Sequence, residues 1–116
     1  MNTTNDRKKE IVRAYKERKP PQGIFAIRCT TTGEIWVASS RHLDTQKNRL
    51  WFGLRLGNYT NVAMQKAWNE HGEGSFQYDI VEEIDVDDLT PYLLDRLLKE
   101  REQHWLLASS AKPVIG

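Results

Sequence analysis

The sequence of 116 residues lacks several features that would define a protein class. It has one cysteine, Cys29, which excludes an intrachain disulfide and a cysteine cluster for structural zinc. No uninterrupted apolar run approaches the roughly 20 residues of a membrane-spanning helix, and residues 1–9 lack the apolar stretch of a secretory signal. Internal repeats and low-complexity segments are also absent. We therefore expect a cytoplasmic protein without a membrane partner.

Large side chains are present in numbers that argue against intrinsic disorder. The chain contains four tryptophans, four tyrosines and three phenylalanines, and 39% of its residues are hydrophobic. A chain of this length corresponds to one domain, which buries roughly two-thirds of the surface that it exposes when unfolded. The composition therefore predicts a single folded domain with its own core.

Charge is unevenly distributed, although the net charge is only +1. Residues 1–69 contain thirteen Lys or Arg and five Asp or Glu, whereas residues 70–116 contain four Lys or Arg and eleven Asp or Glu. A polyanion such as nucleic acid would dock on the basic half, because Lys and Arg make most phosphate contacts. The opposite charges would instead neutralise each other if the two halves met in the fold. Charge alone leaves both interpretations open.

The N-terminal segment is strongly basic. Seven Lys or Arg precede Pro20, and residues 6–18 predict a short helix that Pro20 and Pro21 end. This helix is either a solvated basic surface or a contact with DNA. We therefore divide the chain into a basic helix with its proline stop at 1–21, a domain at 22–108, and a short, loose tail at 109–116.

A β-hairpin is predicted after the two prolines. Residues 23–29 form a short β-branched and aromatic run, and residues 34–39 form a second one. Residues 31–33 supply the turn between them, where Gly33 provides the positive φ that such turns often need. A third strand is predicted from residue 76 onwards, where large apolar side chains recur at every second position.

Three helices are predicted within the domain, each with a recognisable start. Asp44 is expected to cap a helix that ends near Leu56, and Asn61 is expected to cap a second helix. Thr90 and Pro91 begin a third helix, which runs to about Leu107. The residues expected to face the core are Leu43, Leu50 and Leu54 in the first helix, Met64, Ala67, Trp68 and His71 in the second, and Leu94, Leu97, Leu98, Arg101, Trp105 and Ala108 in the third.

The last predicted helix carries a carboxylate at the border of its core-facing side. Glu102 lies about 80° around the helix axis from Leu94. We expect this carboxylate to be half buried and still to reach a cleft. The order of the elements predicts an α/β (α+β) fold, in which helices flank a small, three-stranded, largely antiparallel sheet.

Six motifs occur along the chain in an order that is typical of one family. Gly23-Ile24-Phe25 is followed ten residues later by Trp36-Val37-Ala38. The further motifs are Asn48-Arg49-Leu50, residues 65–72, residues 80–84 and residues 100–106. Together they resemble the GIY-YIG nuclease superfamily, which includes intron-encoded homing endonucleases, over about residues 22–107.

This resemblance implies metal-dependent cleavage of DNA. Glu102 matches the metal-binding glutamate of the family and would hold one Mg²⁺ or Mn²⁺. Arg49 matches the helical arginine that offsets charge at the scissile phosphate. The alternatives are that Glu102 pairs on the helix surface with Lys99 or Arg101, and that Arg49 is a solvated helix residue. The residues that we assign to substrate binding are Ser39, Ser40, Arg41, Lys47 and Arg55.

The chain departs from the family pattern at its signature tyrosines. Phe25 and Trp36 stand where the family has phenols that activate or orient the attacking water, and neither side chain is a base. Trp36 either fills the space of the tyrosine or offers a stacking surface for a base. Gly53 replaces a His or Tyr of the family. Tyr59 lies where some relatives carry a histidine, so it either supplies the missing catalytic phenol or packs as a loop tyrosine.

These residues support three hypotheses about function. One is a divergent metal-dependent endonuclease or phosphodiesterase that acts on DNA. Another is a catalytically impaired nuclease fold that is retained as a nucleic-acid-binding or regulatory module. A third is a protein-interaction domain with Trp51 and Phe52 as interface anchors instead of core residues. A metal site of His42, His71 and His104 is disfavoured, because their spacing fits no short chelating pattern.

Overall fold

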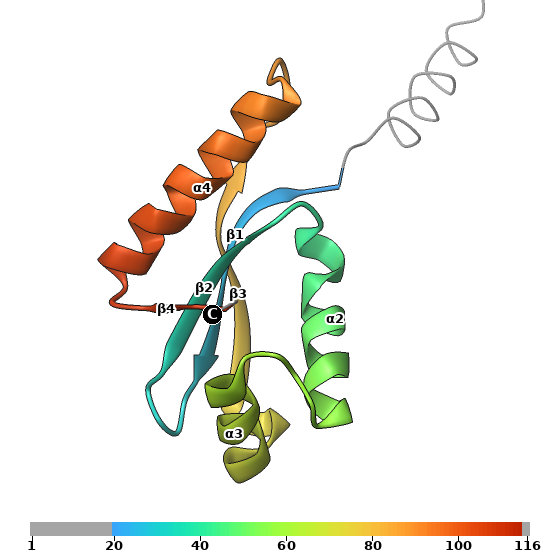
Figure 1. Ribbon diagram of the computed structural model, residues 1–116, viewed down its shortest axis with the longest axis vertical. Helices are drawn as coiled ribbons and strands as arrows, with labels where there is room; N and C mark the ends of the chain where they lie inside the picture. Colours follow the sequence, from blue (N-terminus) through green and yellow to red (C-terminus); the bar gives the residue numbers. More distant parts are fainter. Residues whose placement is uncertain (1–19, 115–116) are drawn as a thin grey trace, which may run out of the picture.

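The structure is a computed structural model that describes residues 20–114 of the chain. Four strands form one sheet in the order β3-β1-β2-β4. Helix α4 covers one face of this sheet, and α2 and α3 lie on the other side (Figure 1). The elements in chain order are β1 (Gln22–Cys29), β2 (Ile35–Ser40), α2 (Leu43–Leu56), α3 (Val62–His71), the short 3₁₀ helix η1 (Glu73–Ser75), β3 (Phe76–Ile84), α4 (Pro91–Ala108) and β4 (Lys112–Pro113). The basic helix predicted over residues 6–18 lies outside the described residues.

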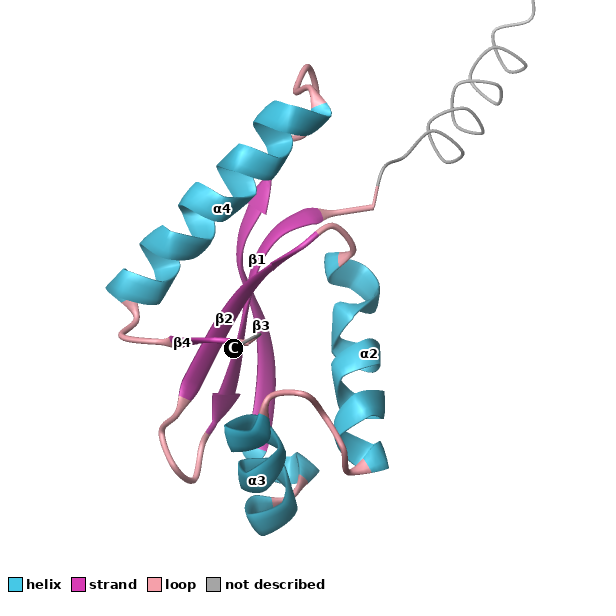
Figure 2. Cartoon of the chain, viewed as in Figure 1, coloured by secondary structure: helices cyan, strands magenta, loops and turns pink. Residues whose placement is uncertain are grey.

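The predicted hairpin and third strand are confirmed. β1 and β2 pair antiparallel from Gly23, opposite Ser40, to Arg28, opposite Ile35. Gly33 in the connecting turn has a φ of 79°, as the sequence predicts. β3 pairs antiparallel with the other side of β1. The mixed α/β class is therefore correct, and Figure 2 shows how its strands and helices are distributed.

The sheet has a fourth strand, so the predicted count of three is wrong. β4 pairs in parallel with the middle of β2, and the Val114 N–H donates to the Val37 carbonyl oxygen at 3.2 Å. The Asn61 side-chain amide donates to the Val114 carbonyl oxygen at 2.7 Å. Val114 is buried. The expectation of a loose tail is therefore wrong for residues 112–114, because their backbone groups find partners on β2 and α3.

The two faces of the sheet have separate cores, because successive side chains of a strand point to opposite faces. The face toward α2 and α3 carries the larger cluster, whose members are Phe25, Ile27, Cys29, Trp36, Ala38, Leu43, Leu50, Trp51, Leu54, Met64, Ala67, Trp68, Phe76 and Val114. The face toward α4 carries a smaller cluster, which consists of Ile24, Ala26 and Val37 with Trp105 and Leu106 packed against it. Most of the buried aromatic area therefore lies on the α2 and α3 face.

The caps of α3 and α4 are the predicted ones. The Asn61 side chain accepts a hydrogen bond from the Met64 N–H at 3.1 Å, and the Thr90 hydroxyl accepts one from the Leu93 N–H at 3.2 Å. Each side chain therefore satisfies one of the N–H groups that a helix start leaves unpaired.

The predicted cap of α2 is wrong by two residues. The helix begins at Leu43 with His42 at the cap position, and Asp44 lies in the first turn. The Leu43 N–H donates to the Pro21 carbonyl oxygen at 2.9 Å, so a contact far along the chain sets the start of the helix. Asp44 still favours the helix through its dipole.

The predicted core-facing positions are mostly buried. In α3, however, His71 is only half buried and Gln65 is buried instead. In α4, Leu94 and Leu98 are buried, whereas Ala108 is exposed. The helical periodicity therefore locates each buried face correctly but misjudges positions at its ends.

Candidate active site

The C-terminal end of β2 is tied to both layers of helices. The Ser39 backbone N–H donates to Glu102 Oε1 of α4 at 3.1 Å. The next residue, Ser40, donates from its hydroxyl to Gln46 Oε1 of α2 at 2.9 Å. Arg41 then pairs with Asp95 of α4 at 2.6 Å. Three consecutive residues thus connect the end of β2 to both α4 and α2.

Glu102 reaches this point because β4 is short. The Val37 carbonyl is paired with the tail, and the N–H of Ser39, two residues further, points to the same side of β2. β4 does not extend that far, so the Glu102 carboxylate takes this N–H. Glu102 is half buried, as predicted.

The alternative pairing partners of Glu102 are engaged elsewhere. Arg101 Nε donates to both carboxylate oxygens of Glu82 on β3, at 2.8 and 3.0 Å. Lys99 lies 4.0 Å from Asp95. The Glu102 carboxylate therefore faces the end of β2 and forms no ion pair with either residue.

Glu82 holds the part of α4 that carries Glu102. Besides accepting from Arg101, it accepts from Trp105 Nε1 at 2.8 Å, and these two donors lie on either side of Glu102 in the helix. Burial alone would raise the pKa of Glu82, but hydrogen bonds from Trp105 and Arg101 and the charge of Arg101 lower it. The ionised Glu82 thus fixes the rotation of α4 above the sheet.

The two aromatic signature positions are inside the core. Phe25 is 1% exposed and Trp36 is 0% exposed. Phe25 stacks on Tyr78 with 5.4 Å between ring centroids, and Trp36 stacks on Phe76 at 6.1 Å. Of the two roles considered for Trp36, the structure supports filling of space, because no face of the ring is open to a base.

The remaining signature residues shape β1 and β2. A Cβ at Gly23 would lie 2.0 Å from the Glu82 carbonyl oxygen, so only glycine allows β1 to pass this close to β3. Ile24, Val37 and Ala38 are all buried. These positions therefore form the sheet and do not present groups for chemistry.

Comparisons with known proteins agree with this geometry. The chain is 30% identical over 90 residues to intron-associated endonuclease 1 of Enterobacteria phage T4, a match over 78% of this chain and 34% of that protein. It also matches the catalytic domain of homing endonuclease I-TevI, with a TM-score of 0.66 and 23% identity over 82% of this chain and 99% of that domain. The chain has the fold of the I-TevI catalytic domain, a GIY-YIG homing endonuclease domain, and is a homologue of the phage endonuclease. A solved variant of the I-TevI catalytic domain gives the same TM-score.

The match to the phage endonuclease covers only part of that protein. The chain spans about one third of the length of the phage endonuclease, and no family model matches it. Among residues 20–114, no helix combines the length and the apolar composition that a membrane span requires.

Arg49 and Gln46 extend from the same part of α2. Arg49 is exposed and has no ion-pair or hydrogen-bond partner among residues 20–114. Gln46, one turn earlier, is half buried and contacts Ser40. The sequence interpretation missed Gln46, although its spacing from Leu43 and Leu50 places it at the border of the buried face.

The predicted substrate-binding residues are placed differently from one another. Ser40 is buried, and its hydroxyl is occupied by Gln46. Arg41 is exposed and paired with Asp95. Lys47 lies 5.6 Å from the centroid of the Trp51 ring. Arg55, near the far end of α2, donates to Glu73 at 2.7 Å. Of these residues, the structure brings only Ser39, Ser40 and Arg41 to the end of β2.

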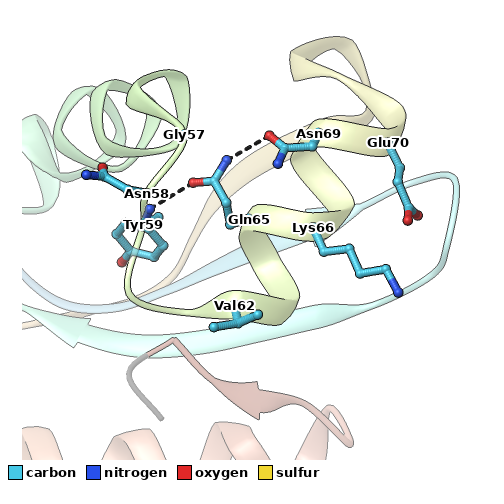
Figure 3. Close-up of a pocket in the computed structure, with 8 residues that line it drawn as sticks. All are labelled: Gly57, Asn58, Tyr59, Val62, Gln65, Lys66, Asn69 and Glu70. Atoms are coloured by element: carbon cyan, nitrogen blue, oxygen red, sulfur yellow. Dashed lines mark hydrogen bonds between the residues drawn. The ribbon is translucent and has the colours of Figure 1, made fainter.

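Tyr59 does not join this group. Its ring lies against Gly53, where a Cβ would be 3.1 Å from Tyr59 Cδ2, and seven residues of helix, about 10 Å, separate Gly53 from Gln46. Its backbone N–H donates to Gln65 Oε1 at 2.9 Å, at the edge of an open pocket of about 500 Å³ (Figure 3). Burial raises the pKa of Tyr59.

A second phenol, which the sequence interpretation missed, lies beside the signature position. Tyr78 stacks on Phe25 and donates its hydroxyl to the Leu43 carbonyl oxygen at 2.9 Å. Burial and the nearby charge of Asp44 raise the pKa of Tyr78 to about 12. Because the Tyr78 hydroxyl is already engaged as a hydrogen-bond donor to Leu43, we assign it a structural role. Only the pairing of β1 with β3 brings it next to Phe25.

The donor set suits a single hard cation. Among residues 20–114, no three His, Cys, Asp or Glu side chains cluster to form a metal site. Glu102 has one oxygen fixed by Ser39, and the other has no partner within the described part of the chain. One carboxylate oxygen with water and phosphate oxygens is a ligand set that fits Mg²⁺ or Mn²⁺.

Proposed function

We propose that this GIY-YIG domain is a metal-dependent DNA endonuclease that hydrolyses a phosphodiester bond at the end of β2. The observation that carries the proposal is the Glu102 carboxylate, which the Ser39 N–H holds at this end of the sheet. Further support comes from the name of the T4 relative, an intron-associated endonuclease, and from the fold shared with a homing endonuclease catalytic domain.

Glu102 is the residue that would hold Mg²⁺ or Mn²⁺. The Ser39 N–H fixes Oε1, so Oε2 is the oxygen left for a cation. When bound, the cation would polarise the scissile phosphate and lower the pKa of a coordinated water. The hydrogen bonds of Arg101 and Trp105 to Glu82 keep α4, and with it Glu102, in this orientation.

Arg49 is our candidate for the cationic partner of the phosphate. Its guanidinium lies on α2 outside the core and has no partner among the described residues, so it is free to pair with a phosphate oxygen. Such a pair would offset the charge that develops on the phosphate as the bond breaks. Arg41 is a less available cation, because Asp95 already pairs with it.

The domain lacks an accessible side chain in the position of the family's catalytic phenol. Phe25 and Trp36 are buried and carry no base, and burial raises the pKa of the phenols of Tyr59 and Tyr78. Loss of a positioned general base costs roughly 10²–10⁴-fold in rate. We therefore expect slow cleavage, which distinguishes this domain from an enzyme with both tyrosines.

The buried Phe25 and Trp36 also favour a second candidate function, a nucleic-acid-binding module without cleavage. In that case DNA would be retained at low salt and released as salt is raised, because bound phosphates release counterions. Binding without nicking under every metal condition is the result that would select this candidate.

Nicking of supercoiled plasmid in Mg²⁺ or Mn²⁺ tests the proposed function. Glu102→Ala is expected to abolish nicking, as is chelation of the metal. Glu100→Ala is the matched control, because Glu100 lies on the same helix but is exposed and pairs with Arg96. Nicking that survives Glu102→Ala would contradict the proposal.

A further inference from the structure

The side chain of Gln46 is held by a directed chain of hydrogen bonds. The His42 backbone N–H donates to Ser40 Oγ at 3.0 Å, and the Ser40 hydroxyl donates to Gln46 Oε1 at 2.9 Å. Ser40 is 7% exposed, so its hydroxyl is protected from competing water. The acceptor end of the Gln46 amide is therefore occupied and fixed in direction.

The donor end of the same amide is free. Nε2 of Gln46 carries two N–H groups and has no hydrogen-bond partner among residues 20–114. Gln46 is half buried. Its partner Ser40 follows Ser39, which binds Glu102. Gln46 and Glu102 thus hold adjacent residues of β2 from opposite faces of the sheet.

We propose that Gln46 Nε2 binds a non-bridging oxygen of the phosphate at this site. The inference rests on the proposed function. The amide nitrogen can only donate, so its ligand must be a hydrogen-bond acceptor, and a non-bridging phosphate oxygen is the acceptor that the proposed reaction supplies. A donor held in place before binding stabilises developing charge without a cost of reorganisation.

Gln46 and Arg49 differ in how they are placed. Arg49 carries a positive charge on an exposed side chain that the protein does not fix. Gln46 is uncharged, but its side chain is held in place by Ser40. The inference therefore assigns to Gln46 the orientation of the phosphate, and leaves to Arg49 the offset of its charge.

Gln46→Glu separates the donor from the rest of the side chain. The carboxylate keeps an acceptor for the Ser40 hydroxyl but replaces both N–H donors by a negatively charged oxygen. We expect the single-turnover cleavage rate to fall about 100-fold, as for loss of one oxyanion donor, while the melting temperature stays close to that of the wild type. Gln103→Glu makes the same change at an exposed position next to Glu102 and controls for added charge.

The role of Ser40 is tested by a double-mutant cycle. Ser40→Ala removes the hydrogen bond that directs the amide, so the effect of Gln46→Glu on the cleavage rate should shrink at least several-fold in the Ser40→Ala background. Additive effects on rate would contradict a shared role, since residues that act through one hydrogen bond show coupled effects.

The outcomes distinguish this inference from the proposed function. Glu102-dependent nicking that Gln46→Glu slows no more than Gln103→Glu would overturn the role of Gln46 and leave the endonuclease proposal intact. A wild-type protein that neither nicks nor retains DNA would overturn both. A selective loss in Gln46→Glu, coupled to Ser40, is the expected result.

Discussion

The face of the sheet under α2 and α3 is packed with aromatic rings, whereas the face under α4 combines a small apolar cluster with hydrogen bonds to two carboxylates. Trp36, Trp51 and Trp68 belong to the first face. On the second face, Glu82 of β3 accepts from Trp105 of α4, and Glu102 of α4 accepts from Ser39 of β2, so both carboxylates join α4 to the strands. The comparison indicates that packing stability comes mainly from the α2 and α3 side of the sheet, while the polar groups of the candidate site come from both sides, Glu102 from α4 and Gln46 and Arg49 from α2.

Substitution of a buried ring on the aromatic face should cause the largest loss in the free energy of unfolding. Trp36→Ala removes a ring with no exposed surface, and we expect it to lower the free energy of unfolding by about 3–5 kcal/mol, or to prevent folding. Urea denaturation measures the loss. Phe52→Ala is the control, because Phe52 is 63% exposed and should change stability by less than about 0.5 kcal/mol. Similar losses in the two variants would contradict the assignment of Trp36 to the core.

Loss of a carboxylate on the α4 face should cause a smaller loss of stability. Glu82→Ala removes the partner of Arg101 and Trp105, and we expect a loss of about 2 kcal/mol together with weaker cleavage, because α4 is no longer held in position. Glu83→Ala changes an exposed carboxylate on the same strand and should have little effect. Equal results for the two variants would remove Glu82 from its positioning role.

Tyr78 tests how much one hydrogen bond adds to the stability of the aromatic face. Tyr78→Phe keeps the ring against Phe25 but loses the hydrogen bond to the Leu43 carbonyl oxygen, so we expect a loss of about 1 kcal/mol in urea. Tyr92→Phe at an exposed position of α4 serves as the reference. Cleavage should persist in Tyr78→Phe, and its complete loss would show that this phenol is catalytic after all.

The smallest expected effect is on the acid side of the stability profile. A carboxyl whose pKa falls on folding contributes stability that is present above its ordinary pKa and is lost as the pH drops through the lowered value. Glu82 is such a group, so the wild type should lose stability below about pH 4.5 more steeply than Glu82→Gln. Denaturation midpoints between pH 7 and pH 3 test this expectation. Superimposable profiles would mean that Glu82 gains nothing from its two donors.

The sequence predicts the parts of the fold that local signals determine. Gly33, Asn61 and Thr90 act through neighbouring backbone groups, so the hairpin turn and two helix starts follow from the sequence. The half-buried position of Glu102 follows from helical geometry alone. β4 has no such signal, because two residues show no periodicity and Pro113 cannot donate to a ladder.

The parts of the site that the sequence does not reveal depend on contacts between distant residues. Tyr78 reaches Phe25 only through pairing of β1 with β3, and Gln46 matters only because Ser40 ends β2 beside α2. Trp51 and Phe52 are adjacent in sequence, yet Trp51 is 5% exposed and Phe52 is 63% exposed. Burial therefore argues against the interface role for Trp51, and that role stays a prediction for Phe52.

Because β4 is short, the outer edge of β2 pairs with two different elements, β4 and the Glu102 side chain of α4. The edge of β2 offers both carbonyl and N–H groups: the Val37 carbonyl oxygen accepts from the Val114 N–H of the tail, and the Ser39 N–H donates to the Glu102 carboxylate. A tail strand that ran one pairing further along β2 would put a backbone carbonyl where the carboxylate of Glu102 now binds. Such a longer strand and Glu102 would compete for the Ser39 N–H, so the short pairing of β4 leaves this donor to the carboxylate.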